Sequence, residues 1–164
     1  MAELTHFDAQ GASRMVDVGD KPMSQRAARA SGIVSMSAST LKLVRDRGVA
    51  KGDVLEVARL AGIQAAKRAD ELIPLCHTLP LDSVEIAFSF PDDTSVAIQA
   101  TTRATARTGV EMEALTAVAV AGLTIYDMCK SVDRGMRIGE ILLEEKTGGR
   151  SGHYVKPAAA SATI

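Results

Sequence analysis

An aspartate and a lysine three residues apart, Asp127 and Lys130, are the pair in this sequence best suited to acid–base chemistry. Residues at positions i and i+3 of a helix lie on one face, so the two side chains can meet if this segment is helical. A dozen mostly apolar residues precede them, and at a partly buried rim the pKa of a lysine falls toward neutrality. On a solvated surface the same pair would contribute little and would indicate no function.

A histidine on a short loop is the second candidate. His77 ends the apolar run 73–77, and Pro74 and Pro80 constrain the backbone on either side of it. An imidazole held in this way can transfer protons near neutral pH. A lone histidine is more often structural, so the residues leave both interpretations open.

Charged residues also gather near glycines and loops. Lys146 and Arg150 lie in the glycine-rich run 146–152, and Lys21 and Arg26 lie near the other end of the chain. This distribution suits a small molecule with several phosphates. The run does not match the common phosphate-binding loop, because its basic residues have the wrong offsets, and a mobile basic tail is the alternative explanation.

Two acids, Glu111 and Glu113, stand at the expected start of the longest helix. They complement the positive end of the helix dipole, which accounts for them without any ligand. The functional alternative is that these acids, or the free backbone N–H groups beside them, contact a ligand.

Alternating apolar residues predict the strands that must position these side chains. The clearest are 84–90 and 96–107, which we expect to form an antiparallel hairpin around a turn at 91–94. One face of the second strand should be exposed to solvent. Two further strands are expected over 29–37 and 136–143.

Capping residues and helical spacing predict three helices: one from Ser37 or Ser39 to Gly48, one from Asp53 to about Glu71, and one over 111–132. Gly62 lowers the helix propensity of the second and therefore indicates a close approach to another helix. The third is Ala-rich and apolar on nearly all sides, so it should be covered by the sheet and by another subunit.

The order strand, two helices, two strands, long helix and strand predicts an α+β fold of the ferredoxin-like kind, with a mostly antiparallel sheet and helices packed on one face. We expect one domain over residues 1–156, in which residues 1–25 form a partly mobile arm. Residues 157–164 are an Ala- and Ser-rich tail that we expect to be disordered.

Composition excludes several classes of function for this chain of 164 residues. A net charge of −1 and an aromatic content of 3% argue against a protein that binds nucleic acid polymers or anionic lipid. Two cysteines do not make a disulfide framework, and the N-terminus has no secretory signal. The weakly polar stretch 114–128 is expected to fall short of a membrane span. We therefore expect a soluble, cytoplasmic protein.

The longer motifs resemble the MoaC family of cyclic pyranopterin monophosphate synthases, in the same order and spacing, from about residue 4 to residue 151. The segments that carry the resemblance are Met-Val-Asp-Val at 15–18, Lys-Gly-Asp-Val at 51–54, 61–68, Ile-Pro-Leu-Cys-His at 73–77, 108–116 and 123–130.

This resemblance implies a lyase of molybdenum cofactor biosynthesis, which converts 3′,8-cyclo-7,8-dihydro-GTP into cyclic pyranopterin monophosphate and releases diphosphate. It also implies a hexamer, a trimer of dimers, with sites at subunit interfaces. The catalytic residues implied by position are Asp127, Lys130 and Lys51. The residues implied to bind substrate are Leu75, Cys76, His77, Met112, Glu113, Asp17, Lys21, Arg26, Lys146 and Glu111. The sequence shows no carboxylate cluster for a metal, although Mg²⁺ could accompany the diphosphate as it leaves.

Two positions depart from the family pattern. Thr78 stands where the family usually has a proline, which could loosen the histidine loop, and Arg150 stands where a lysine is frequent, which keeps the charge.

Helix geometry adds a constraint on the site. Glu113 and Asp127 are separated by roughly 21 Å along one helix, at about 1.5 Å per residue. Either a long substrate spans both ends or two subunits each supply one end of a site, and we expect the latter. The alternative function is a non-catalytic sensor that binds a nucleotide. The residues that discriminate between the two are Lys51, His77, Asp127 and Lys130, because a sensor has no use for an Asp–Lys acid–base pair.

Overall fold

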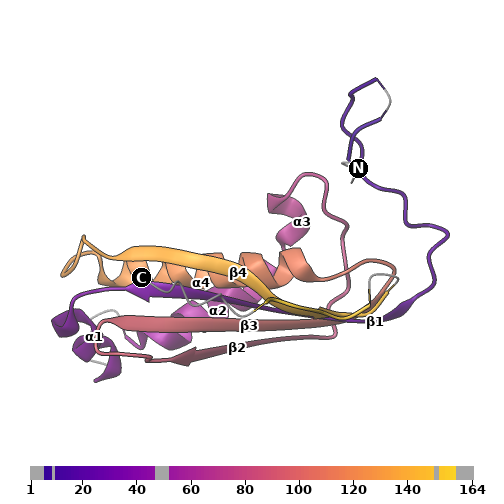
Figure 1. The fold of residues 1–164 in the computed structure, drawn as a ribbon. Helices are drawn as coiled ribbons and strands as arrows, with labels where there is room; N and C mark the ends of the chain where they lie inside the picture. The colour runs from indigo at the N-terminus through magenta and orange to yellow at the C-terminus, as the bar shows by residue number, and fades with distance from the viewer. Residues whose placement is uncertain (1–5, 9, 47–51, 150–151, 158–164) are drawn as a thin grey trace, which may run out of the picture.

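The computed structural model describes residues 6–8, 10–46, 52–149 and 152–157, and within them the strands form one antiparallel sheet in the order β2-β3-β1-β4-β5 (Figure 1). The strands are β1 (Ser24–Ser35), β2 (Ser83–Ser89), β3 (Ser95–Ala106), β4 (Arg137–Thr147) and β5 (Tyr154–Val155). The helices are α1 (Ala38–Arg45), α2 (Val54–Ala66), α3 (Ala69–Leu72) and α4 (Glu111–Cys129). The first four strands and their helices follow the split βαβ order, so the α+β, ferredoxin-like prediction is confirmed.

The central strand β1 pairs with β3 on one side and with β4 on the other. Ala30 lies opposite Ala100 of β3 and Leu143 of β4. The predicted hairpin is also present, with Phe88 of β2 opposite Ile98 of β3. Long antiparallel ladders of this kind fix which residues share each face of the sheet.

The core lies between one face of the sheet and the helices α2 and α4. Ala28, Ala30 and Val34 alternate along β1 and are buried on that face. A Cβ added at Gly32 would lie 2.6 Å from Cγ1 of Val118, so a small residue is needed where α4 crosses β1. The opposite face of β3 is polar and exposed, as the alternation predicts.

Helix α2 begins as predicted and packs closely against α4. The Asp53 side chain accepts hydrogen bonds from the backbone N–H groups of Leu55 and Glu56. A Cβ at Gly62 would lie 2.9 Å from the carbonyl oxygen of Ala117, which confirms that this glycine marks a close helix approach. The Ser37 cap of α1 is confirmed as well.

Several predicted boundaries are wrong. The helix predicted over 53–71 divides into α2 and α3, because Arg68 leaves the helical region with φ −124° and ψ 23°. Strand β1 begins five residues before the predicted position 29, since its alanines have weak strand propensity but pair along all of β3. Strand β4 extends to Thr147, because its charged last residues pair with β1 although they carry no strand pattern, and β5 is too short to show a period.

The long helix α4 connects the two ends of the molecule. Its N-terminal end lies on the side of α3, and its C-terminal end lies on the side of α1 (Figure 1). By length and composition its 19 residues could cross a membrane, so the expectation that this segment falls short is wrong. More than half of that stretch is buried against the sheet and α2, as in the core helix of a soluble protein. The N-terminal arm leads away from the sheet (Figure 1).

Candidate functional site

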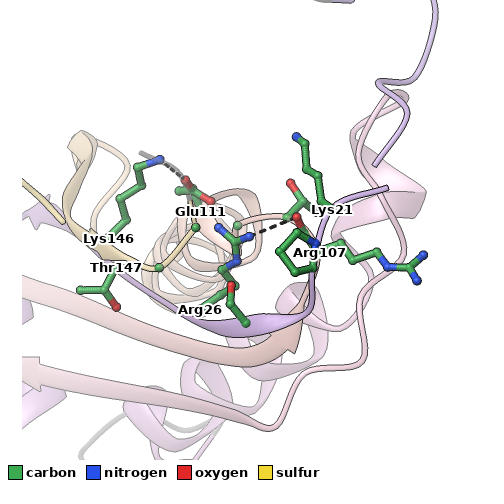
Figure 2. A pocket seen from close by; sticks show the side chains of 12 residues that line it. Lys21, Arg26, Arg107, Glu111, Lys146 and Thr147 are labelled. Atoms are coloured by element: carbon green, nitrogen blue, oxygen red, sulfur yellow. Dashed lines mark hydrogen bonds and ion pairs between the residues drawn. The ribbon is translucent and has the colours of Figure 1, made fainter. Parts of the chain in front are cut away.

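A cationic pocket of about 590 Å³ lies where β1 and α4 begin and where β3 and β4 end. Four basic side chains line it, Lys21, Arg26, Arg107 and Lys146, against one acid, Glu111. Figure 2 shows Arg26 between Lys21 and the Lys146–Glu111 pair, whereas the Arg107 side chain runs away from them. Three predicted substrate-binding cations therefore meet in one pocket whose charge suits a multiply charged anion.

Backbone groups hold Arg26 in position. Its guanidinium donates hydrogen bonds to the carbonyl oxygens of Arg107 at 3.1 Å and Ala106 at 3.4 Å, both at the end of β3. The glycine loop after β4 closes over it: a Cβ at Gly149 would lie 1.7 Å from Nη1 of Arg26. Gly148 has φ +99° and its Cβ would lie 2.2 Å from a backbone oxygen of β1. Only glycine fits these two positions.

The predicted residues Lys146 and Glu111 form an ion pair across this pocket. The Nζ of Lys146 lies 3.1 Å from Oε1 of Glu111, and the two side chains are only 26% and 25% exposed. Partial burial reduces the screening of such a pair by solvent. The pair therefore fixes a cation at the pocket and lowers the net charge of the pocket.

A second pocket, of about 560 Å³, adjoins the first and shares Thr108, Gly109 and Glu111 with it. The predicted substrate-binding residues Leu75, Cys76, His77 and Met112 line it. The shared residues lie at the start of α4 and line both pockets. One ligand can therefore extend from the cationic pocket into this more apolar one. The structure thus brings together the two groups that the sequence placed in distant segments.

Two neighbouring side chains hold the histidine loop in place. Nε2 of His77 lies 2.8 Å from the carbonyl oxygen of Val16, and it donates a hydrogen bond to that oxygen in the tautomer with the proton on Nε2. The hydroxyl of Thr78 donates to Oδ2 of Asp70 in α3 at 2.5 Å. The expectation that Thr78 loosens this loop is therefore not supported: its hydroxyl supplies a link that a proline could not make.

Glu113 lies beneath the second pocket rather than on its wall. Its side chain is buried, with the residue 3% exposed, and Cys76 Sγ donates to its Oε1 at 3.8 Å. Among the described residues its Oε2 has no hydrogen-bond partner. Burial raises the pKa of this carboxyl above its usual range, and burial together with the charge of Glu113 raises the pKa of the Cys76 thiol to about 11.

Asp17 takes part in a local turn of the arm. Its Oδ1 accepts a hydrogen bond from the backbone N–H of Gly19 at 2.8 Å. It does not belong to the walls of either pocket, unlike Lys21 four residues later. The structure therefore does not bring Asp17 together with the other predicted ligands.

The Asp127–Lys130 pair forms as predicted, at the opposite end of α4. The Nζ of Lys130 lies 2.5 Å from Oδ1 of Asp127, and the side chains are 53% and 62% exposed. Fourteen residues of helix, roughly 21 Å, separate Asp127 from Glu113. The pair is more exposed than the partly buried rim expected from the sequence, and it lies far from both pockets of its own chain. Lys51, the third predicted catalytic residue, lies outside the described residues.

Sequence reasoning missed Arg107 and Ser24, which line the cationic pocket. Arg107 could have been found as the basic residue that ends the predicted strand just before the acidic helix start. Ser24 gave no signal, although its buried hydroxyl has no partner among the described residues. In the same part of the chain, no three His, Cys, Asp or Glu side chains gather in a way that could hold a metal ion.

Comparison with known proteins gives one consistent result. The model of the MoaC family matches residues 15–149. Cyclic pyranopterin monophosphate synthase 1 of Mycobacterium tuberculosis (strain H37Rv) is 58% identical, over 95% of this chain and 92% of its own. The enzymes of that name from Magnetococcus marinus and Thermomicrobium roseum are 60% and 61% identical, over 96% and 94% of this chain and 98% and 93% of theirs. The matched span includes both ends of α4 and all four cations of the first pocket.

Proposed function

The chain belongs to the MoaC family, and on that premise we propose that its two adjoining pockets and an Asp127–Lys130 pair together form one active site. The reaction is the synthesis of cyclic pyranopterin monophosphate, after which its relatives are named. In this step of molybdenum cofactor biosynthesis, 3′,8-cyclo-7,8-dihydro-GTP is rearranged and diphosphate is released. The observation that carries the site proposal is the convergence of Lys21, Arg26 and Lys146 beside a second, apolar pocket.

The cationic pocket is the proposed site of the triphosphate. The cyclic phosphate forms when a sugar hydroxyl attacks the α-phosphorus: a new O–P bond forms, the bond to the bridging oxygen breaks, and diphosphate leaves with that electron pair. The hydroxyl proton passes to a base. Lys21, Arg26 and Lys146 stabilise the negative charge on the departing group. Phosphate oxygens compete with Glu111 for Lys146, so the ion pair is exchanged for a contact with substrate.

The second pocket is the proposed site of the fused ring system. Leu75 and Met112 offer apolar contacts to it, and the imidazole of His77 is held at the wall by the arm. Glu113 lies below Cys76 and acts on the ring only through that neighbour, unless the pocket floor moves.

The proton transfers are assigned to Asp127 and Lys130, together with Lys51. The Nζ of Lys130 and the Oδ1 of Asp127 lie 2.5 Å apart, so the two groups can act together on one substrate as an acid and a base. Because roughly 21 Å of helix separates this pair from the ring pocket, a neighbouring subunit must supply it. We therefore propose a homo-oligomer, a trimer of dimers as the family resemblance implies, with each site at a subunit interface.

No resident cofactor is proposed. The described residues bring together no set of three metal-binding side chains, so any Mg²⁺ would enter with the phosphates of the substrate. We place the reaction in the cytoplasm, where a free thiol such as that of Cys76 persists.

The deciding experiment supplies the purified protein with 3′,8-cyclo-7,8-dihydro-GTP and measures both diphosphate and the pyranopterin product. We expect equal amounts of the two, and none from GTP, which lacks the cyclised ring. Tight binding of the cyclised nucleotide without release of diphosphate would instead favour the sensor function.

A further inference from the structure

One carboxylate outside the proposed site joins the start of α1 to the turn that follows the Asp127–Lys130 pair. Asp133 follows α4, and its Oδ2 accepts hydrogen bonds from the backbone N–H of Ser37 at 2.8 Å and from the Thr40 hydroxyl at 3.2 Å. Its Oδ1 accepts from the N–H of Gly135 at 2.9 Å. These contacts, that of Ser37 first, hold the pKa of Asp133 below its usual range, so the group is a charged acceptor at neutral pH.

The arrangement completes a helix cap from a distant part of the sequence. In a capping box, the first side chain accepts from the N–H three residues on, and the residue there reaches back to the N–H of the cap. The first half is present in α1, where the Ser37 hydroxyl accepts from Thr40 N–H at 3.3 Å. Thr40 is too short to complete the second half, and its hydroxyl bonds to Ser37 Oγ and to Asp133 instead. Asp133, 96 residues away, supplies the missing acceptor.

The same residue is attached to the last turn of α4. Its backbone N–H donates to the carbonyl oxygen of Cys129 at 3.1 Å, and the Lys130 N–H donates to Tyr126 at 2.8 Å. Asp133 is thus held by its backbone to the helix end that carries Asp127 and Lys130, and by its side chain to the start of α1. Without this side chain, the turn after Lys130 would lose its hydrogen bonds to the start of α1.

We propose that Asp133 is a positioning residue for the Asp127–Lys130 pair. The inference rests on the proposed function, because it assigns Asp133 the task of fixing the backbone from which that pair acts. A catalytic pair supplied to a neighbouring subunit must keep its position to within a fraction of an ångström, and displacement of about 1 Å can cost a hundredfold in rate.

The test compares two variants that weaken α1 by similar amounts. Asp133→Asn keeps the shape of the side chain, but its amide cannot accept from Ser37, Thr40 and Gly135 together. Ser37→Ala removes the side-chain half of the cap and leaves the backbone bond from residue 37 to Asp133 intact. Both variants should lower Tm by a few degrees. With 3′,8-cyclo-7,8-dihydro-GTP as substrate, we expect kcat to fall at least tenfold in Asp133→Asn, with KM changed less than threefold, and both to be near wild type in Ser37→Ala.

Different results would overturn the positioning role of Asp133 and the proposed function. Equal loss of kcat in both variants, or a loss in Asp133→Asn that follows Tm alone, would show that Asp133 is merely structural. If Asp133→Asn does not fold, Thr40→Val, which removes one of the three donors, should lower kcat by a smaller factor, and a wild-type kcat in that variant would overturn the proposal. An inactive wild-type protein would overturn the proposed function itself.

Discussion

The backbone of Gly149 lies against the guanidinium of Arg26 so closely that a single added carbon would sit 1.7 Å from Nη1. Gly149→Ala must therefore displace either Arg26 or the glycine loop from the cationic pocket. We expect KM for the cyclised nucleotide to rise about tenfold, the cost of roughly one charge-assisted contact. Steady-state kinetics would measure the change.

The matched control for this substitution is Gly152→Ala. Gly152 has φ +62°, close to the φ of +72° at Gly149, but a Cβ there meets nothing within 4 Å. Both variants carry the same backbone strain, so only the contact with Arg26 differs. An equal rise in KM for both would mean that backbone strain, and not Arg26, governs binding.

Asp127→Ala and Lys130→Ala should each lower kcat by a hundredfold or more, because each removes a member of the proton-transferring pair. Both side chains are more than half exposed, so Tm should change by no more than about 2 °C. Glu85→Ala breaks a similarly exposed pair with Arg103 on the polar face of the sheet and should leave kcat unchanged. Normal turnover by Lys130→Ala would contradict the assigned chemistry.

Two inactive variants should restore activity to one another if each site draws on two subunits. Arg26→Ala damages the phosphate pocket and Lys130→Ala damages the far end of α4. After random mixing of subunits by mild denaturation and refolding, about a quarter of the sites would combine two intact halves. Activity assays before and after mixing would detect this recovery. Failure to recover, with the mixed oligomers shown by mass spectrometry, would place both ends of the site in one chain.

The buried acid Glu113 should make stability depend on pH. Its pKa is raised by burial, so the folded chain binds this proton more tightly than the unfolded chain. The resulting stabilisation is complete below the ordinary pKa of a glutamate and is lost as pH rises through the folded pKa. Glu113→Gln replaces the titrating carboxyl with an amide, so this loss of stability at higher pH does not occur in the variant. Its Tm relative to wild type, measured by thermal unfolding, should therefore rise from pH 4 to pH 8.

The Cys76 thiol should react slowly with iodoacetamide. With a pKa of about 11, roughly one part in a thousand is thiolate at pH 8. Glu113→Gln removes a charge that contributes to this shift, so alkylation of Cys76 should be faster in that variant, as peptide mass spectrometry can follow. Cys129 is fully buried and serves as the unreactive reference. A rate unchanged by the substitution would indicate that burial alone sets the reactivity.

The sequence predicts those parts of the fold that depend on short-range patterns. Asp53 and Ser37 are recognisable as caps, and the alternation of β2 and β3 fixes their pairing. The division of α2 from α3 at Arg68 and the early start of β1 depend on tertiary contacts, which local propensity does not contain.

The same limit applies to the site. Arg26 and Lys146 could be suspected from their charge and nearby glycines, and the family resemblance named them. The ion pair of Lys146 with Glu111, the burial of Glu113 and the hydroxyl of Ser24 arise only when β1, β4 and α4 come together. Asp133 escaped notice because its partner lies 96 residues away.

The glycines at the packing contacts of α4 also keep that helix rigid. Gly32 in β1 and Gly62 in α2 bring backbone to within contact of it, and Gly122 within α4 does the same against Ile138. Because no side chain separates the two surfaces at these positions, bending or sliding of α4 would force packed atoms into one another. The distance between the phosphate end and the acid–base end is therefore a constant of the molecule, and any adjustment to the changing shape of the reactant must come from the arm and the loops.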